Sequence, residues 1–285
     1  MSDILCQLQN ALLTNSLDRE NASLHCLSIY QCYKPQQLHH VSFTLPTMLM
    51  VVNGHKEVKI NDKSLSIKKG DLLLLPPGTT MWIGNFPDNQ KKTYIGLGFR
   101  FDQEALKHFR LIYGSSLEHW DTSAQFHAKA PDSVITILNQ MLDWNNRYST
   151  DVQLIQHRQV ELLLLLAQEG LVGNILLGEH PSWKQRVTQL LITDPARSWE
   201  FGDVCSRFGV SESSLRRKLQ SEQANFRELL EEARLSHGLY LLLETVHPIG
   251  LVADAAGYQS QSRFGERFKR RFGMTPTELR RTLVA

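Results

Sequence analysis

The chain has 285 residues, 42% of them hydrophobic and 21% charged, which is the composition of a globular protein of about two domains. The formal net charge of +2 is too small to indicate a nucleic-acid partner by itself. The longest apolar run, Leu162 to Ala167, is too short to span a bilayer, and the first residues lack the pattern of a signal peptide. We therefore expect a cytoplasmic protein with no membrane partner.

The four cysteines are Cys6, Cys26, Cys32 and Cys205, and no two of them form a Cys-x-x-Cys pair. This spacing predicts neither a zinc site nor a redox dithiol, so we interpret them as buried thiols.

From Leu24 to Phe101, short apolar runs alternate with turn residues, which is typical of β-strands. Val51 and Val52 precede Asn53-Gly54, a strong signal for a two-residue hairpin. Further turns are predicted near residues 61–63, 70–71 and 76–78, with another strand from Thr93 to Phe101. Many short strands at this spacing predict a β-sandwich or small barrel.

The segment from Leu65 to Thr79 resembles the strand-turn-strand unit of cupin-type jelly rolls. Metal-binding cupins carry a His-x-His pair and a downstream Glu, whereas His39 and His40 are adjacent here. Adjacent residues on a strand point to opposite faces, so we expect no metal, no other cofactor and no enzymatic activity. A cupin-type metalloenzyme fused to a DNA-binding tail remains an alternative, which elemental analysis would test.

Helical periodicity follows Phe101. One helix is predicted from the N-cap Asp102 to about Leu111, a second from Pro131-Asp132, and a third from about Asp151 to Gln168. The third has a wide apolar surface, and either packing on the sheet or a dimer seam would explain it. The segment from Gly170 to Pro181 is predicted to be a linker.

The basic residues gather at the end of the chain. From Pro181 onward there are 16 Lys and Arg against 12 Asp and Glu, which leaves a net charge of −2 on the preceding part. The same part contains two copies of one pattern, Phe201 to Leu219 and Ile249 to Phe268. A basic, duplicated segment is an expected feature of a nucleic-acid-binding domain.

Each copy has a small residue four positions before a glycine, Cys205 with Gly209 and Ala253 with Gly257. The small residue lets two helices approach, and the glycine permits the tight turn between them, as in a helix-turn-helix. Apolar pairs at i, i+4 would bury one face of each second helix, Leu215 with Leu219 and Phe264 with Phe268. A long helix, from about Phe226 to Glu244, is predicted to join the copies.

The run from Trp183 to Arg281 resembles the DNA-binding domain of the AraC/XylS family of bacterial regulators, most specifically from Val252 to Arg280. That family commonly places a cupin-like domain before this tail. The resemblance implies an α+β protein, with a cupin-like β-sandwich or barrel and flanking helices followed by an all-α domain of two helix-turn-helix units. We predict a sensing and dimerisation domain at residues 1–170, a linker at 171–181 and the DNA-binding domain at 182–285.

The chain departs from the family pattern at four positions, of which Cys205 in place of the usual alanine is a small change. Gly238 replaces the usual alanine of the joining helix, which predicts a softer helix. Ala224 replaces a glycine, which leaves Asn225 as the residue expected to adopt a positive φ. Glu266 stands where the family often has arginine, and a glutamate there would accept from cytosine, repel a phosphate or pair with a neighbouring residue.

The resemblance also implies which residues meet DNA. Base edges in two successive major grooves, about 10 bp apart, would be read by one group of residues and phosphates would be bound by another. The predicted base-contacting residues are Ser213, Arg216, Arg217, Gln261, Ser262 and Arg263, and the predicted phosphate-contacting residues are Lys218, Lys269, Arg270 and Arg271.

The resemblance thus implies a sequence-specific transcriptional regulator of promoter DNA, an activator that works with RNA polymerase and can form a homodimer. Its N-terminal domain would respond to an apolar carboxylate effector or, alternatively, to a regulatory protein. Four cationic residues near the apolar strands are candidates for binding the carboxylate: Lys34, Lys56, Lys59 and Arg100. A fatty or aromatic acid that changes neither the melting temperature nor the DNA affinity would contradict this assignment.

Overall fold

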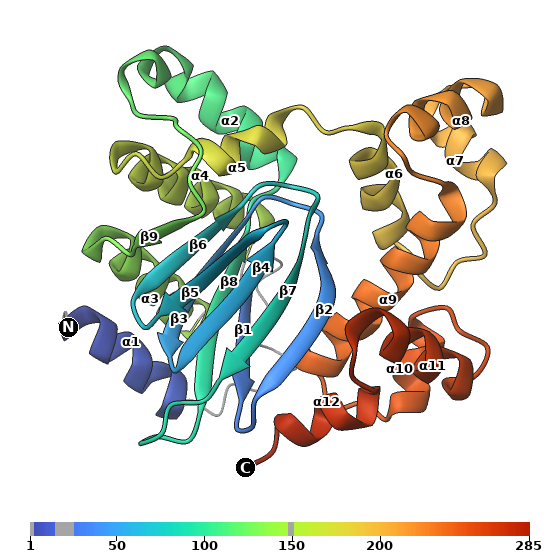
Figure 1. Ribbon diagram of the computed structural model, residues 1–285. Coiled ribbons are helices and arrows are strands. Elements are labelled where there is room, and N and C mark those ends of the chain that lie inside the picture. The colour runs from blue at the N-terminus through green and yellow to red at the C-terminus, as the bar shows by residue number, and fades with distance from the viewer. Residues whose placement is uncertain (1–2, 15–25, 148–150) are drawn as a thin grey trace.

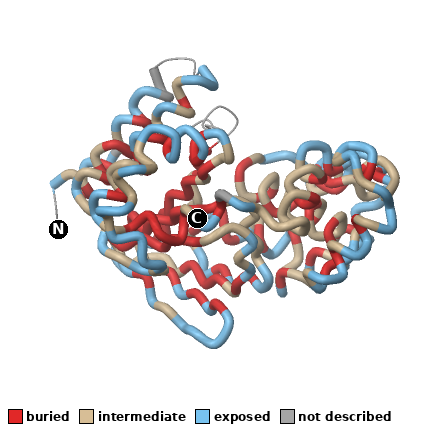
Figure 2. The backbone as a smooth tube through the Cα atoms, turned by 90° about the horizontal axis from the view of Figure 1, so that it is seen from above, coloured by how far each residue is buried: buried red, intermediate tan, exposed pale blue. Residues whose placement is uncertain are grey.

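The computed structural model describes residues 3–14, 26–147 and 151–285. Two antiparallel sheets form the centre of the first half, and helices form the second (Figure 1). This confirms the predicted α+β class. Buried backbone runs through the middle of the sheet region and in smaller clusters through the helical region (Figure 2). In the part of the chain that the structure describes, no helix has the length and apolarity needed to cross a membrane.

The five-stranded sheet has the order β1-β8-β3-β6-β9, and the four-stranded sheet has the order β2-β7-β4-β5. The first consists of β1 (Leu27–Cys32), β3 (Thr47–Asn53), β6 (Asp71–Leu75), β8 (Tyr94–Arg100) and β9 (His127–Lys129). The second consists of β2 (Gln36–Phe43), β4 (His55–Ile60), β5 (Lys63–Lys68) and β7 (Thr79–Phe86).

Strand β3 is buried along its whole length because both of its faces are covered. Met48 and Met50 point into the core shared with the helices, whereas Leu49 and Val51 point into the core between the two sheets. Strand β4 instead alternates exposed and buried residues, since one of its faces meets solvent. A strand that is covered on both faces is therefore apolar along its length, whereas a strand covered on one face alternates apolar and polar residues.

The hairpin predicted at Asn53-Gly54 is wrong. Gly54 does turn the chain, with φ +77°, but β3 and β4 belong to different sheets and the turn carries the chain from one to the other. The buried Asn53 amide supports this crossing by donating to the Thr93 carbonyl at 2.6 Å. The two-residue hairpin lies one strand later, where Ile60 pairs with Lys63 across a turn containing Asn61 at φ +51°.

Helices cover the outer face of the five-stranded sheet (Figure 1). The Asp102 side chain caps α2, as the sequence predicted, and the Asp151 side chain caps α4. The apolar face of α4 is buried in the core with α2 and α3, so packing accounts for it. The elements of this layer are α1 (Asp3–Thr14), α2 (Gln103–Tyr113), α3 (Asp132–Arg147), α4 (Val152–Gln168), α5 (Gly173–Leu176) and the 3-10 helices η1 (Gly114–His119) and η2 (Leu177–Glu179).

The segment predicted to be a linker differs from expectation, since most of it is folded against the sheet. Helix α5 and η2 occupy residues 173–179, and the buried Asn174 amide donates to the carbonyls of Leu74 and Gln125 at 2.9 and 2.7 Å. Only residues 180–182 then connect η2 to the following helices.

The second half is all helical, as predicted, and α9 has the predicted bounds. The expectation for Asn225 is wrong: it has φ −133° and caps α9 with its side chain, while Gln223 takes the positive φ of 52°. The helices are α6 (Trp183–Ile192), α7 (Phe201–Phe208), α8 (Glu212–Ser221), α9 (Phe226–Glu244), α10 (Ile249–Ala255), α11 (Gln261–Phe272) and α12 (Pro276–Thr282).

Candidate nucleic-acid interface and the adjoining cavity

Two helix-turn-helix units stand at the two ends of α9 (Figure 1). Helices α7 and α8 form the first, and α10 and α11 form the second. Their turns contain Gly209 and Gly257, both in the left-handed region with φ +63° and +78°. The small residues Cys205 and Ala253 are buried where the paired helices approach. This is the geometry that the duplicated sequence pattern predicted.

The second helix of each unit is anchored by its apolar face. Leu215 and Leu219 of α8 are buried in a core with α6, α7 and α9. Phe264, Phe268 and Phe272 of α11 fill a second core, where adjacent ring centroids lie 5.4 and 4.6 Å apart. Each helix therefore turns its polar face away from its own core.

That outward face contains the residues predicted to contact bases. All six are exposed: Ser213, Arg216 and Arg217 on α8, and Gln261, Ser262 and Arg263 at the start of α11. The Arg216 guanidinium lies 5.1 Å from the Phe201 ring centroid, so a base contact by Arg216 has to replace this packing. Glu266 is exposed on the same helix as Arg263.

The four residues predicted to contact phosphate have different surroundings. Lys269 is exposed, whereas the Lys218 Nζ lies 3.9 Å from the Trp183 ring centroid. Arg270 pairs with Glu231 of α9 at 3.1 Å. Arg271 is only partly exposed and pairs with Glu232 of α9 at 3.1 Å while donating to the Ser42 hydroxyl of β2 at 2.9 Å. Of these four, Lys269 is the one most open to a phosphate.

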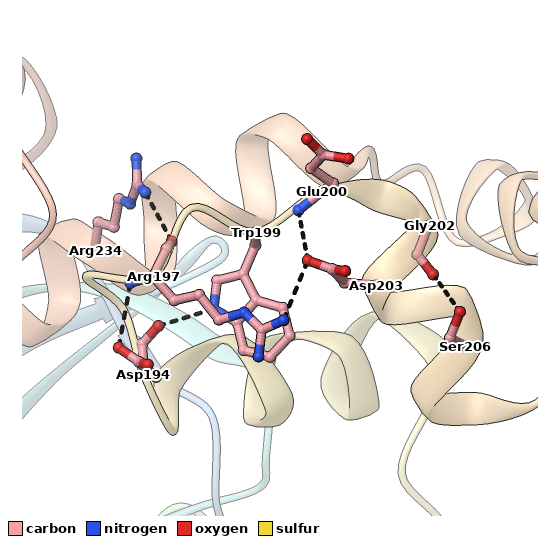
Figure 3. A network of polar contacts seen from close by, with 8 residues as sticks. All are labelled: Asp194, Arg197, Trp199, Glu200, Gly202, Asp203, Ser206 and Arg234. Atoms are coloured by element: carbon pink, nitrogen blue, oxygen red, sulfur yellow. Dashed lines mark hydrogen bonds and ion pairs between the residues drawn. The ribbon is translucent and has the colours of Figure 1, made fainter.

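The loop between α6 and α7 fixes the first unit to α9 (Figure 3). The Arg234 guanidinium donates to the carbonyls of Pro195 and Arg197 at 3.0 and 3.1 Å. The Trp199 indole donates to the Asp194 carbonyl at 2.8 Å, and Asp203 accepts from the Arg197 side chain and the Glu200 backbone (Figure 3). These contacts close the loop and set the start of α7.

The loop between α6 and α7 also meets the turn of the second unit beside α9. A β-carbon on Gly257 would lie 2.8 Å from both the Pro195 carbonyl oxygen and the Arg234 Nε, so glycine permits this close approach as well as the turn. A groove of about 670 Å³ opens here between this loop, α9 and the second unit, and Arg263 forms part of its wall. Its other basic residues were not singled out from the sequence, although their spacing on α9 and α11 could have shown them: Arg227, Arg234 and Arg267.

A separate cavity of about 350 Å³ lies between the sheets and α9. The structure brings Lys56 and Arg100 to its wall, together with the hydroxyl-bearing rings of Tyr30 and Tyr94. Lys34 and Lys59 are exposed elsewhere, and Lys59 lies over the Trp82 ring. The apolar part of the wall comes from both halves of the chain: Leu38, Val41, Phe43, Leu45, Leu49, Ile83, Ile192, Leu239 and Leu243.

Lys56 is the unusual residue of this cavity. It is 5% exposed, its ammonium donates to Asn85 Oδ1, and it lies 5.3 Å from the Tyr94 ring centroid. Burial lowers the pKa of Lys56 from 10.5 to about 7. Burial also raises the pKa of Tyr94, whose hydroxyl has no hydrogen-bond partner among the described residues. Among those same residues, no carboxylate forms an ion pair with Lys56.

Comparison with known proteins finds related domains for both halves of the chain. A helix-turn-helix domain model matches residues 204–282, and a model of the ExsA N-terminal regulatory domain matches residues 46–173. The Escherichia coli dual transcriptional regulator Rns is 26% identical over 66% of this chain and 72% of its own length. The E. coli urease operon transcriptional activator is 26% identical over 82% of each chain. The activator FapR of E. coli is 33% identical, over 33% of this chain and 36% of its own.

The chain belongs to the AraC/XylS family. It is a DNA-binding transcriptional regulator with a regulatory N-terminal half and a C-terminal pair of helix-turn-helix units. The structure of ToxT from Vibrio cholerae matches 91% of this chain and 98% of its own with a TM-score of 0.65 and 14% identity. That likeness shows that the two proteins share the whole two-part fold.

In this AraC/XylS-family regulator, the regulatory half contacts the second helix-turn-helix unit directly. Leu38 of β2 is buried in the same apolar core as the phenylalanines of α11. The His39 ring lies against Gly273, where a β-carbon would be 2.6 Å from the ring. The sequence did not reveal this contact, because single residues on distant segments leave no periodic pattern.

Proposed function

We propose that this regulator is an activator and that an apolar carboxylate in the cavity controls its binding to promoter DNA. Several of its relatives are named activators, among them FapR and the urease operon activator. The observation on which the effector proposal depends is Lys56, a buried lysine without a carboxylate partner among the described residues, in a cavity whose wall is largely apolar.

A carboxylate bound in the cavity would stabilise the buried ammonium of Lys56. A buried ammonium is costly unless an opposite charge lies beside it, and the lowered pKa of Lys56 expresses that cost. Arg100 adds a second cation and Tyr94 a hydroxyl donor at the same wall. The apolar wall would receive a hydrocarbon or aromatic body, so the proposed ligand is an acid with a carboxylate head and an apolar tail.

ToxT structures support this class of ligand. One contains a bound unsaturated fatty acid, and another contains (E)-4-(8-methylnaphthalen-1-yl)but-3-enoic acid. Both molecules join one carboxylate to an apolar body. The chemistry of Lys56 and its surroundings in this chain suits the same class.

For the DNA, we propose base contacts by the six exposed residues of α8 and α11 and phosphate contacts chiefly by Lys269. The joining helix α9 would hold the two units at elements about 10 bp apart. We further propose that the regulator acts in the cytoplasm as a homodimer through its N-terminal half and recruits RNA polymerase.

The effector proposal is tested by comparing palmitoleate with palmitoleyl alcohol, which has the same tail without the carboxylate. We expect the acid to raise the melting temperature of the protein and the alcohol to have a much smaller effect. Lys56→Met should abolish the difference, whereas Lys59→Met, an exposed lysine of the same strand, should keep it. Equal shifts with acid and alcohol, or no shift with either, would contradict the proposal.

A further inference from the structure

A row of hydrogen bonds connects the cavity to the last helix of the DNA-binding half. Lys56 donates to Asn85 Oδ1, and Asn85 Nδ2 donates to Gln36 Oε1 at 3.2 Å. Gln36 Nε2 then donates to the Thr282 hydroxyl at 2.6 Å, and that hydroxyl donates to the Leu279 carbonyl at 2.6 Å. The row starts in the regulatory half and ends inside α12.

The members of this row are buried and point in one direction. Lys56, Asn85, Gln36 and Thr282 are between 2% and 6% exposed. A protonated lysine can only donate, so it fixes the Asn85 oxygen toward itself and the Asn85 amide nitrogen toward Gln36. The Gln36 amide is oriented in turn, with its nitrogen toward Thr282. A change at Lys56 therefore changes the orientation preferred by every later member.

Helix α12 is held to the regulatory half at this same point. The Thr282 carbonyl accepts from the backbone N–H groups of Tyr33 and Lys34 at 2.8 and 3.4 Å. Leu279, one turn earlier, is buried in the core that contains Leu38 of β2. The second helix-turn-helix unit is thus docked on β2 through α12 as well as through α11.

We infer that Asn85 and Gln36 are positioning residues that transmit occupancy of the cavity to helix α12. This inference rests on the proposed function for the identity of the effector. A carboxylate beside Lys56 keeps the ammonium protonated and donating, and so strengthens the row that ends at Thr282. The second unit then stays docked on β2, and the affinity for DNA falls.

Docking opposes DNA binding because it uses part of the second recognition helix. Arg271, in the last turn of α11, donates to Ser42 of β2 and pairs with Glu232. A DNA phosphate near this turn would compete with both partners. Loosening α12 from β2 frees the second unit to adjust to a major groove.

The first experiment needs no effector. Amide hydrogen exchange is measured for residues 277–283 in the full chain, comparing wild type with Lys56→Met and with the exposed-lysine control Lys59→Met. The hydrogen bond and ring contact that Lys56 makes among the described residues go to Asn85 and Tyr94, not to α12. The row therefore predicts faster exchange in α12 for Lys56→Met and unchanged exchange for Lys59→Met. Unchanged exchange in Lys56→Met would overturn the inference, whether or not any acid binds.

The second experiment measures DNA affinity with and without palmitoleate. Thr282→Val keeps the volume and removes the hydroxyl, while Ser42→Ala removes a docking contact outside the row. We expect Thr282→Val to bind palmitoleate within about twofold of wild type but to lose the acid-dependent change in DNA affinity, and Ser42→Ala to retain it. If palmitoleate changed the DNA affinity of Thr282→Val as much as that of wild type, the inference that the row transmits occupancy would be refuted. If wild type did not bind palmitoleate, only the effector proposal would be refuted.

Discussion

Gly238 lies in the middle of α9 directly against the Phe264 ring of α11, and a β-carbon at position 238 would be 2.7 Å from Phe264 Cε2. The glycine therefore allows the joining helix and the second recognition helix to pack in close contact. This gives Gly238 a packing role that its low helix propensity alone does not suggest.

Gly238→Ala is expected to destabilise the protein, although alanine favours a helix by about 1 kcal/mol. Overpacking against a fully buried ring costs about 1–3 kcal/mol, so the net loss should be about 1 kcal/mol. Urea unfolding of the full chain measures the free energy of unfolding. Gly265→Ala is the matched control, since a β-carbon there meets nothing within 4 Å, and it should stabilise α11 by up to about 1 kcal/mol. A stabilising Gly238→Ala would show that Phe264 can move away.

Arg217→Ala is expected to lower the affinity for the specific site by about 1–3 kcal/mol and to leave binding to random DNA nearly unchanged, because a base contact carries sequence information. Lys269→Ala should weaken binding to all sequences alike and reduce the salt dependence by about one charge, because phosphates are the same everywhere. Fluorescence anisotropy on specific and random duplexes at several salt concentrations measures both effects. Equal losses on the two duplexes for both variants would contradict the assignment.

Arg271→Ala is expected to weaken binding to random DNA less than Lys269→Ala, although both residues lie near the end of α11. The Arg271 guanidinium is already paired with Glu232 and bonded to Ser42, whereas Lys269 is exposed. The same anisotropy titration compares the two variants, with Arg270→Ala, whose partner is Glu231, as an intermediate case. A larger loss for Arg271→Ala would mean that its partners release it on DNA.

The sequence predicted the parts of this fold that depend on local patterns. Helix α9 has the expected bounds, and Asp102 caps the helix that it was predicted to cap, because capping and helical periodicity act within a few residues. The two glycine turns of the helix-turn-helix units belong to the same class. Each of these features is determined by neighbours in the chain.

The features that the sequence did not predict depend on contacts between distant segments. Asn53-Gly54 has the composition of a hairpin turn, but both faces of β3 are covered and the chain crosses to the other sheet. The sequence could not show that Lys56, and not Lys34 or Lys59, lines the cavity. The pairing of β4 with β7, which places Asn85 beside Lys56, joins segments that are distant in the chain. The candidate effector site therefore emerged from the fold, and the recognition surfaces from the sequence pattern.

The lowered pKa of Lys56 predicts a pH dependence of stability. Between about pH 7 and pH 10.5, Lys56 is largely neutral in the folded chain and still protonated when unfolded. The unfolded state then binds more protons, so the contribution of Lys56 to the free energy of unfolding rises with pH across this window and is constant below it. Subtracting the stability of Lys56→Met from that of wild type at each pH isolates this contribution, and the same subtraction with Lys59→Met should give no slope.

Palmitoleate should flatten the Lys56 slope, because a paired carboxylate raises the pKa of the ammonium toward its ordinary value. A difference between wild type and Lys56→Met that stays constant across the window would mean that Lys56 keeps its proton in the folded protein, which would require an anionic partner already in place.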